Sequence, residues 1–60
     1  MRTIVKLLRG MKETVYDEMD LPYIPEGALL RTPHVASCRV VVSAIDIAPA
    51  SGPIQTLVVQ

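Results

Sequence analysis

The single histidine and the single cysteine of the chain, His34 and Cys38, lie four residues apart. An imidazole next to a thiol can generate a reactive thiolate, so this pair is the first candidate for nucleophilic catalysis. A spacing of four brings side chains together on a helix, but Pro33 before the pair and the valines after it favour a loop that enters a strand. No third group is evident to orient the imidazole. We therefore expect His34 to be a loop residue and Cys38 to be a buried, chemically inert strand residue.

Three acidic residues close together, Asp17, Glu18 and Asp20, could supply oxygen ligands to a metal ion. The stretch lacks the further ligands and the glycine of a calcium-binding loop, and in a strand Asp17 points away from the other two. A solvated, salt-bridged strand face is the simpler interpretation. Two carboxylates for glycoside hydrolysis would have to flank a cleft, which a small barrel rarely encloses. We predict no catalytic, cofactor-binding or metal-binding residue, and no cofactor.

Nucleic-acid binding is a weaker candidate function. Phosphate cradles need a glycine-rich loop ahead of a helix, and the three glycines of this chain are not clustered. Proteins that bind single strands combine basic grooves with aromatic stacking platforms, and the only aromatic residues are Tyr16 and Tyr23. Tyr16 would lie among the basic residues of a first strand if residues 2 to 20 form a hairpin. A nucleic-acid-binding small barrel that uses this basic strand is therefore the alternative function.

Length and composition describe one small domain, residues 1 to 60. Six basic and six acidic residues give no net charge, and hence no global attraction to nucleic acid or to an anionic membrane. No apolar run approaches the roughly 20 residues that span a bilayer, and no signal-peptide pattern is present, so we expect a cytoplasmic protein. One cysteine excludes an internal disulfide, and half of the residues are apolar. A chain of this size benefits from a partner subunit.

The stretch from 38 to 48 is the longest run of β-branched and small apolar residues, and it predicts a central strand. Its apolar side chains occupy even positions in the first half and odd positions in the second half. A β-bulge at Ser43–Ala44 would produce this switch and would bend the strand as a small barrel requires. The alternative is a strand that is covered on both faces, which needs no switch.

Residues 2 to 20 predict a β-hairpin with a three-residue loop, Gly10 to Lys12. Residues 1 to 12 carry four basic and no acidic residues, whereas residues 13 to 26 carry five acidic and no basic ones. Folding about the loop brings four pairs together: Arg9 with Glu13, Leu7 with Val15, Arg2 with Asp20, and Lys6 diagonally with Glu18. Such cross-strand pairs stabilise a hairpin by roughly 0.2–1 kcal/mol each. Gly10 can also adopt the positive φ that hairpin loops need.

A helix over the same residues is the competing prediction. Five apolar residues would share one helix face: Ile4, Leu8, Met11, Val15 and Met19. A glycine in the middle and several β-branched residues oppose the helix. If it formed, the fold would be α+β, with an N-terminal helix on a small sheet.

The rest of the chain predicts a stiff connection, a short strand and a last strand. Pro22 and Pro25 keep residues 21 to 27 extended, and Tyr23 and Ile24 could then cover one end of a barrel. Residues 28 to 32 form the short strand. Residues 54 to 60 form the last strand, which should pair antiparallel with the stretch from 38 to 48 through a loop with two prolines and a glycine.

These elements follow a definite order: a first hairpin, the connection Leu-Pro-Tyr-Ile-Pro-Glu-Gly at residues 21 to 27, a short strand and a closing hairpin. This order resembles that of small SH3-like β-barrel proteins. The resemblance implies an all-β, five-stranded SH3-like barrel whose strands are joined mainly by hairpins. Such proteins commonly carry an acidic residue or a second turn residue after the glycine, where this chain has Ala28 and Leu29. Many SH3-like barrels are binding modules, and small ones also occur among phage and mobile-element proteins.

The sequence therefore favours a non-enzymatic module for protein–protein binding or assembly. Its partner would be another protein or the chain itself, as a homo-oligomer or part of a larger assembly. Apolar residues on both faces of the expected strands support this, since one small barrel has only one interior. The last strand, Ile54 to Val59, carries no charged residue that would protect an exposed edge, which favours pairing with a neighbour. No membrane contact is expected.

Overall fold

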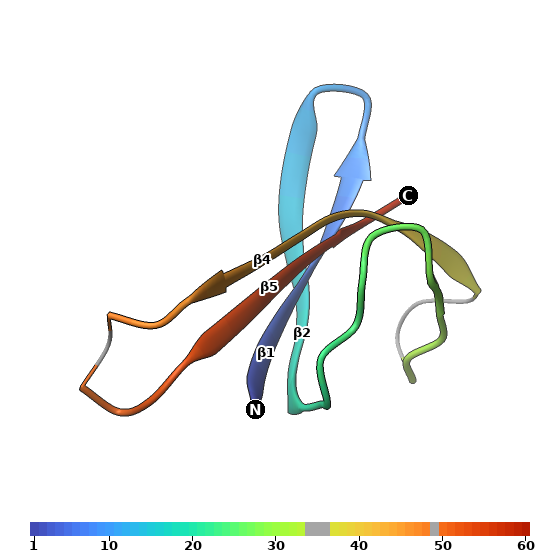
Figure 1. Ribbon diagram of the computed structural model, residues 1–60. Coiled ribbons are helices and arrows are strands. Elements are labelled where there is room, and N and C mark those ends of the chain that lie inside the picture. Colours follow the sequence, from blue (N-terminus) through green and yellow to red (C-terminus); the bar gives the residue numbers. More distant parts are fainter. Residues whose placement is uncertain (34–36, 49) are drawn as a thin grey trace.

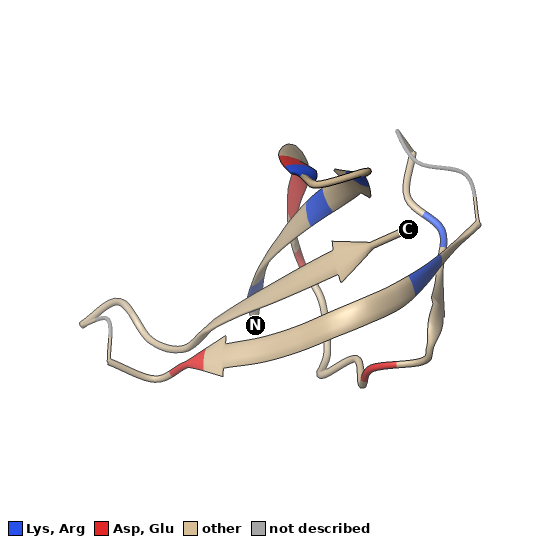
Figure 2. Cartoon of the chain, turned by 90° about the horizontal axis from the view of Figure 1, so that it is seen from above, with Lys and Arg blue, Asp and Glu red and all other residues tan. Residues whose placement is uncertain are grey.

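The computed structural model describes residues 1–33, 37–48 and 50–60, and these form one sheet without a helix (Figure 1). The five strands are β1 (Arg2–Arg9), β2 (Lys12–Asp20), β3 (Leu29–Leu30), β4 (Cys38–Asp46) and β5 (Ile54–Val59). Their order in the sheet is β2-β1-β5-β4-β3, and the sheet curls into a half-barrel (Figure 2). The all-β prediction with five strands is confirmed, and the N-terminal helix is excluded. The described residues contain no helix of the length and apolar character that crossing a membrane requires.

The predicted first hairpin is present, but its turn is tighter than expected. The two central residues are Gly10 and Met11, so Arg9 lies opposite Lys12. Gly10 has a φ of 61°, whereas Met11 has no positive φ. This combination fits a type II′ turn, which matches the right-handed twist of paired strands. The prediction of a three-residue loop that ends at Lys12 was therefore wrong by one residue.

The tighter turn changes the partners near the loop and leaves those at the open end unchanged. Leu7 lies opposite Thr14, and the predicted pairs of Arg9 with Glu13 and of Leu7 with Val15 do not form. The register then passes from Lys6–Val15 to Val5–Asp17, which leaves Tyr16 as an extra residue in a β-bulge. The bulge restores the expected register, so Arg2 lies opposite Asp20 as predicted.

Substitution of Gly10 by alanine is expected to destabilise the protein by about 1 kcal/mol, because an L-residue is strained at this positive φ. A Cβ added at Gly10 would meet nothing within 4 Å, so the cost comes from the backbone alone. Chemical synthesis with D-alanine at the same position provides the control, since a D-residue fits the turn. Urea unfolding of both proteins measures the difference. Equal stability of the two alanine enantiomers would contradict a type II′ turn.

The central strand of the sheet is β5, and not the stretch from 38 to 48 as predicted. β5 pairs in parallel with β1 on one side and antiparallel with β4 on the other. The expected antiparallel pairing of the last two strands is thus confirmed, but the expectation that β5 has an open edge was wrong. The bulge in β4 also lies elsewhere, because the register skips Val41 and runs regularly through Ser43 and Ala44. The bulge therefore lies opposite Val58 and Val59, and not where the apolar pattern within β4 changes.

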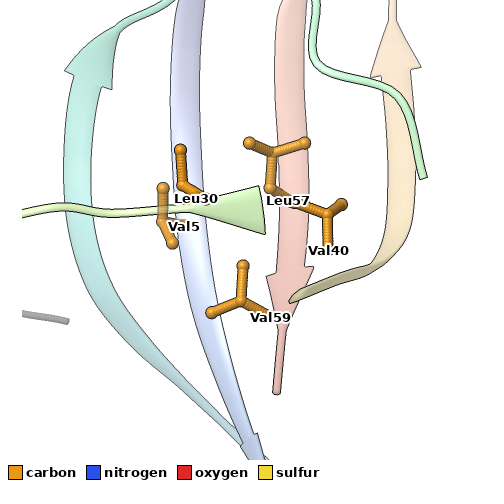
Figure 3. Packing of buried hydrophobic residues seen from close by; sticks show 5 residues of the cluster. All are labelled: Val5, Leu30, Val40, Leu57 and Val59. Carbon is orange, nitrogen blue, oxygen red and sulfur yellow. The ribbon is translucent and has the colours of Figure 1, made fainter. Parts of the chain in front are cut away.

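The core lies on one face of the sheet, which we call the inner face. Its fully or nearly fully buried apolar residues are Val5, Leu30, Val40, Leu57 and Val59 (Figure 3). The connection from β2 to β3 covers this face, since Leu21, Ile24 and Ala28 pack against the same cluster. Ile24 therefore has the covering role that was expected of the connection, whereas Tyr23 is exposed. The opposite side of the sheet is the outer face.

Candidate functional site

Cys38, one of the two candidates for nucleophilic chemistry, begins β4 and packs against the core. It is half-buried, so the expectation of full burial was too strong. Its place beside Val40 is that of a small apolar residue that fills the edge of the core. His34 lies outside the described residues. The structure therefore supports a packing role for Cys38 and does not address the pair.

The three acidic residues on β2 do not converge on one point. Asp17 lies opposite the buried Val5, whereas Glu18 and Asp20 lie opposite Ile4 and Arg2 on the other face of the sheet. Asp20 contacts the N-terminal ammonium group, and Asp17 Oδ1 accepts a hydrogen bond from the backbone N–H of Glu18. Among residues 1–33, 37–48 and 50–60, no three His, Cys, Asp or Glu residues are grouped as a metal site would require.

The basic residues of β1 lie next to the acidic residues of β2. Arg2 Nε is 2.5 Å from Glu18 Oε1, and Lys6 Nζ is 4.0 Å from Glu13 Oε1. Figure 2 shows the two kinds of charge side by side on the hairpin. Ion pairs at such exposed positions contribute little stability, but they reduce the positive potential that a phosphate backbone would meet. The predicted diagonal contact of Lys6 with Glu18 is replaced by the contact with Glu13, because the register is shifted near the turn.

A buried polar residue on the central strand fixes the connection above the core. The side chain of Gln55 is fully buried, and both of its polar atoms have hydrogen-bond partners. Its Nε2 donates to Thr3 Oγ1 and to the Pro22 carbonyl, both at 3.0 Å, and its Oε1 accepts from the Ile24 N–H at 2.8 Å. Ser43 Oγ adds a bond to the Ile24 carbonyl at 2.6 Å. We call this set the Gln55 clamp; sequence reasoning missed it.

The two edges of the sheet differ in how well they are protected against further strand pairing. The free edge of β2 carries five charged residues along its length: Lys12, Glu13, Asp17, Glu18 and Asp20. It also contains the bulge at Tyr16 and the local bond from the Glu18 N–H to Asp17. Charges, bulges and capped backbone groups are the features by which natural sheets discourage edge pairing. We conclude that β2 is a protected edge.

The other edge belongs to β4, because β3 is only two residues long and covers just its beginning. β3 pairs with Cys38 and Arg39, and the backbone of Gly27 and Ala28 binds that of Val40. In the remainder, from Val42 to Asp46, no backbone hydrogen bond to a connecting segment is present in the described part of the chain. This part of the strand is an open edge, which we call the β4 edge.

The backbone groups that point outward at the β4 edge follow from its pairing with β5. Arg39 and Gln60 exchange two backbone hydrogen bonds, so both face each other across the ladder. The alternation of an antiparallel pair, continued through the bulge at Val41, turns the N–H and C=O groups of Ser43 and Ile45 away from β5. These four groups are available to a further strand.

Apolar side chains flank this open backbone on both faces. Val42, on the outer face, is 48% exposed, and Ile45, on the inner face, is 42% exposed. Ile47, which follows the strand, is 82% exposed. The one charged residue from Val40 to Ile47 is Asp46, at the end of the strand. A nearly uncharged edge with exposed β-branched residues is a typical site of strand addition.

Sequence reasoning located an unprotected edge on the wrong strand. The second half of β4 has a single charged residue, which was a signal for an unprotected edge. β5 has no charged residue at all, so the sequence favoured β5 over β4. Only the parallel pairing of β1 with β5 shows which of the two strands is covered. No family model, curated protein or solved structure matches this chain, so its candidate site is defined by this geometry.

Proposed function

We propose that this chain is a non-enzymatic module for protein–protein contact or assembly, and that it acts by adding a strand to the β4 edge. The observation that carries the proposal is the open backbone of Ser43 and Ile45 between exposed apolar side chains. An added strand gains main-chain hydrogen bonds from the edge, and the alternating side chains provide specificity.

The contrast between the two edges supports this proposal. One edge of the sheet has a dense row of charges and a bulge, whereas the other has an apolar and nearly uncharged stretch. The resemblance to SH3-like barrels agrees with a binding role. A cytoplasmic, phage or mobile-element setting belongs to the same proposal and rests on the sequence alone. None of the described candidates for chemistry forms a site, so we assign the module no reaction.

Selection of displayed random peptides of about eight residues on the immobilised protein tests strand addition at this edge. Nanomolar protein should enrich extended peptides rich in β-branched residues, and Ala44→Lys should abolish their binding, since lysine on an edge discourages pairing. The matched control is Thr14→Lys, which places the same charge at an exposed position of the β2 edge and should leave binding unchanged. Absence of enrichment, or equal effects of both variants, would contradict the proposal.

Nucleic-acid binding remains the second candidate because two basic residues, Arg9 and Lys12, are exposed at the tip of the first hairpin. Titration of a mixed oligonucleotide at low and high salt separates the two functions. Affinity that falls steeply with salt and is lost in the double variant Arg9→Ala, Lys12→Ala would favour this candidate. We expect no measurable binding at low salt, which would remove it.

A further inference from the structure

We infer that the strand added at the β4 edge comes from a second copy of this chain, through antiparallel β4–β4 pairing about a two-fold axis at Ala44. The two sheets would then join into one continuous sheet. This inference rests on the proposed function, because it names the partner of the same edge. A two-fold axis pairs one patch with its own copy, which is the commonest arrangement of homodimers.

The available length of the edge determines the register. Gly27 and Ala28 already bind the backbone of Val40, and the strand ends at Asp46, so an incoming strand has the stretch from Val42 to Asp46. The midpoint of this stretch is Ala44. Ser43 of each copy then lies opposite Ile45 of the other, and the outward N–H and C=O groups of both residues pair across the axis.

The side chain at the axis permits a close approach. The backbone groups of Ala44 point toward β5, so the two copies of Ala44 form a non-hydrogen-bonded pair, in which the Cα atoms are only about 4.5 Å apart. Alanine is small enough for this spacing. The exposed Val42 lies on the same outer face as Ala44, and the exposed Ile45 lies on the inner face beside Ser43 of the other copy. Both apolar side chains would lose exposed area.

Charge argues for a second copy over a charged peptide. Asp46 is the one ionisable residue of the paired stretch, and the two-fold axis puts the two carboxylates at opposite ends. Four residues at about 3.3 Å each separate them by about 13 Å, beyond the screening length at physiological salt. The centre offers no charge that would select an acidic or basic partner, whereas the same neutral apolar edge matches itself.

Light scattering behind size exclusion, over a range of protein concentrations, tests the inference on the full chain. We expect a dimer at micromolar concentration, and Ala44→Lys should raise its dissociation constant by roughly tenfold or more, because two lysines would face each other at the axis. Thr14→Lys should leave the dimer unchanged. A monomer at every concentration, or a dimer that only Thr14→Lys dissociates, would overturn the inference.

A covalent probe tests the register without relying on a destabilising charge. In a Cys38→Ser background, Ala44→Cys should form an interchain disulfide rapidly on mild oxidation, since Cα atoms about 4.5 Å apart lie within disulfide reach. Thr14→Cys in the same background should crosslink at the slow rate of random collision. Equal crosslinking rates would overturn the register. If the chain is monomeric but still selects extended peptides that Ala44→Lys rejects, the second copy is refuted and the proposed function stands.

Discussion

Replacement of Gln55 by leucine is expected to lower the free energy of unfolding by about 3 kcal/mol or more. Leucine occupies much of the same space, but the Ile24 N–H and the Pro22 carbonyl lose their bonds to the side-chain amide, and the Thr3 hydroxyl keeps only its bond to the Met1 carbonyl. Each buried polar group without a partner costs about 1–3 kcal/mol. Urea unfolding at one fixed protein concentration measures the change, and the concentration is fixed because association would add to the stability.

Ser43→Ala is the matched control for the Gln55 clamp. It removes one hydrogen bond to the same connection, the bond to the Ile24 carbonyl, and leaves the Gln55 side chain in place. We expect a loss of about 1 kcal/mol, the usual net contribution of one hydrogen bond. If Gln55→Leu costs no more than Ser43→Ala, the clamp does not hold the connection on the core.

The variant Gln55→Glu separates polarity from proton-donating capacity. A carboxylate can accept from the Ile24 N–H, but it cannot donate to Thr3 or Pro22, and it is buried. Burial raises the pKa of the introduced carboxyl above its value in the unfolded chain. The variant should therefore be most stable, relative to the natural protein, below the unfolded pKa of about 4.3 and should lose stability as the pH rises through the folded pKa. A pH-independent difference between the two proteins would contradict full burial at this position.

Local composition was sufficient to predict the strands and the first hairpin. β-branched residues mark the pleated segments, and the separation of basic from acidic residues between the first and second strands indicates which two segments pair. The register at the open end of the hairpin was predicted correctly from this charge pattern, since Arg2 does lie opposite Asp20. The length of the turn could not be predicted in the same way, because Gly10 supports a two-residue or a three-residue loop equally well.

The bulges and the strand order depend on contacts between residues far apart in the chain. The register set by the two-residue turn and the register of the pairing at Arg2 differ by one residue, and Tyr16 is the extra residue in β2 that joins them. The parallel pairing of β1 with β5 joins the two ends of the chain, and no local pattern encodes it. A signal for the central position of β5 was present, since Leu57, Val58 and Val59 form an unbroken apolar run. Such a run is typical of a strand covered on both faces.

The sequence predicted an open strand edge, but on β5 and not on β4. Apolar residues on both faces of the strands, in a chain without a disulfide, led to the expectation of a surface for another chain. β3 has two residues and not the five expected from residues 28 to 32, and it lies opposite Cys38 and Arg39. The residues before it, Gly27 and Ala28, reach only Val40, so Val42 to Asp46 stay open. Gln55 also lacked a local signal, since only the folded connection brings Pro22 and Ile24 to it.

Leu57→Ala is expected to have the largest effect of any single truncation in this core. Leu57 is fully buried at the middle of the central strand, where it lies opposite Val5 on β1 and Ser43 on β4. Truncation of a buried leucine to alanine costs about 2–5 kcal/mol, which includes the cavity that remains. At about 0.05–0.15 kcal/mol per residue, a chain of 60 residues has roughly 3–9 kcal/mol in total. We therefore expect this single truncation to remove a large part of the total stability, measured as a lower urea midpoint.

Leu29→Ala is the control for this prediction, because it makes the same chemical change where the side chain is 72% exposed. Surface substitutions away from special features change stability by about 0.5 kcal/mol or less, so this variant should unfold close to the natural protein. Leu30→Ala, one residue further on and buried against the core from β3, should fall between the two, since Leu30 is 9% exposed whereas Leu57 is fully buried. The urea midpoint should therefore rise in the order Leu57→Ala, Leu30→Ala, Leu29→Ala, which follows from the positions of the residues in the sheet. A reversed order would mean that β3, and not β5, carries the core.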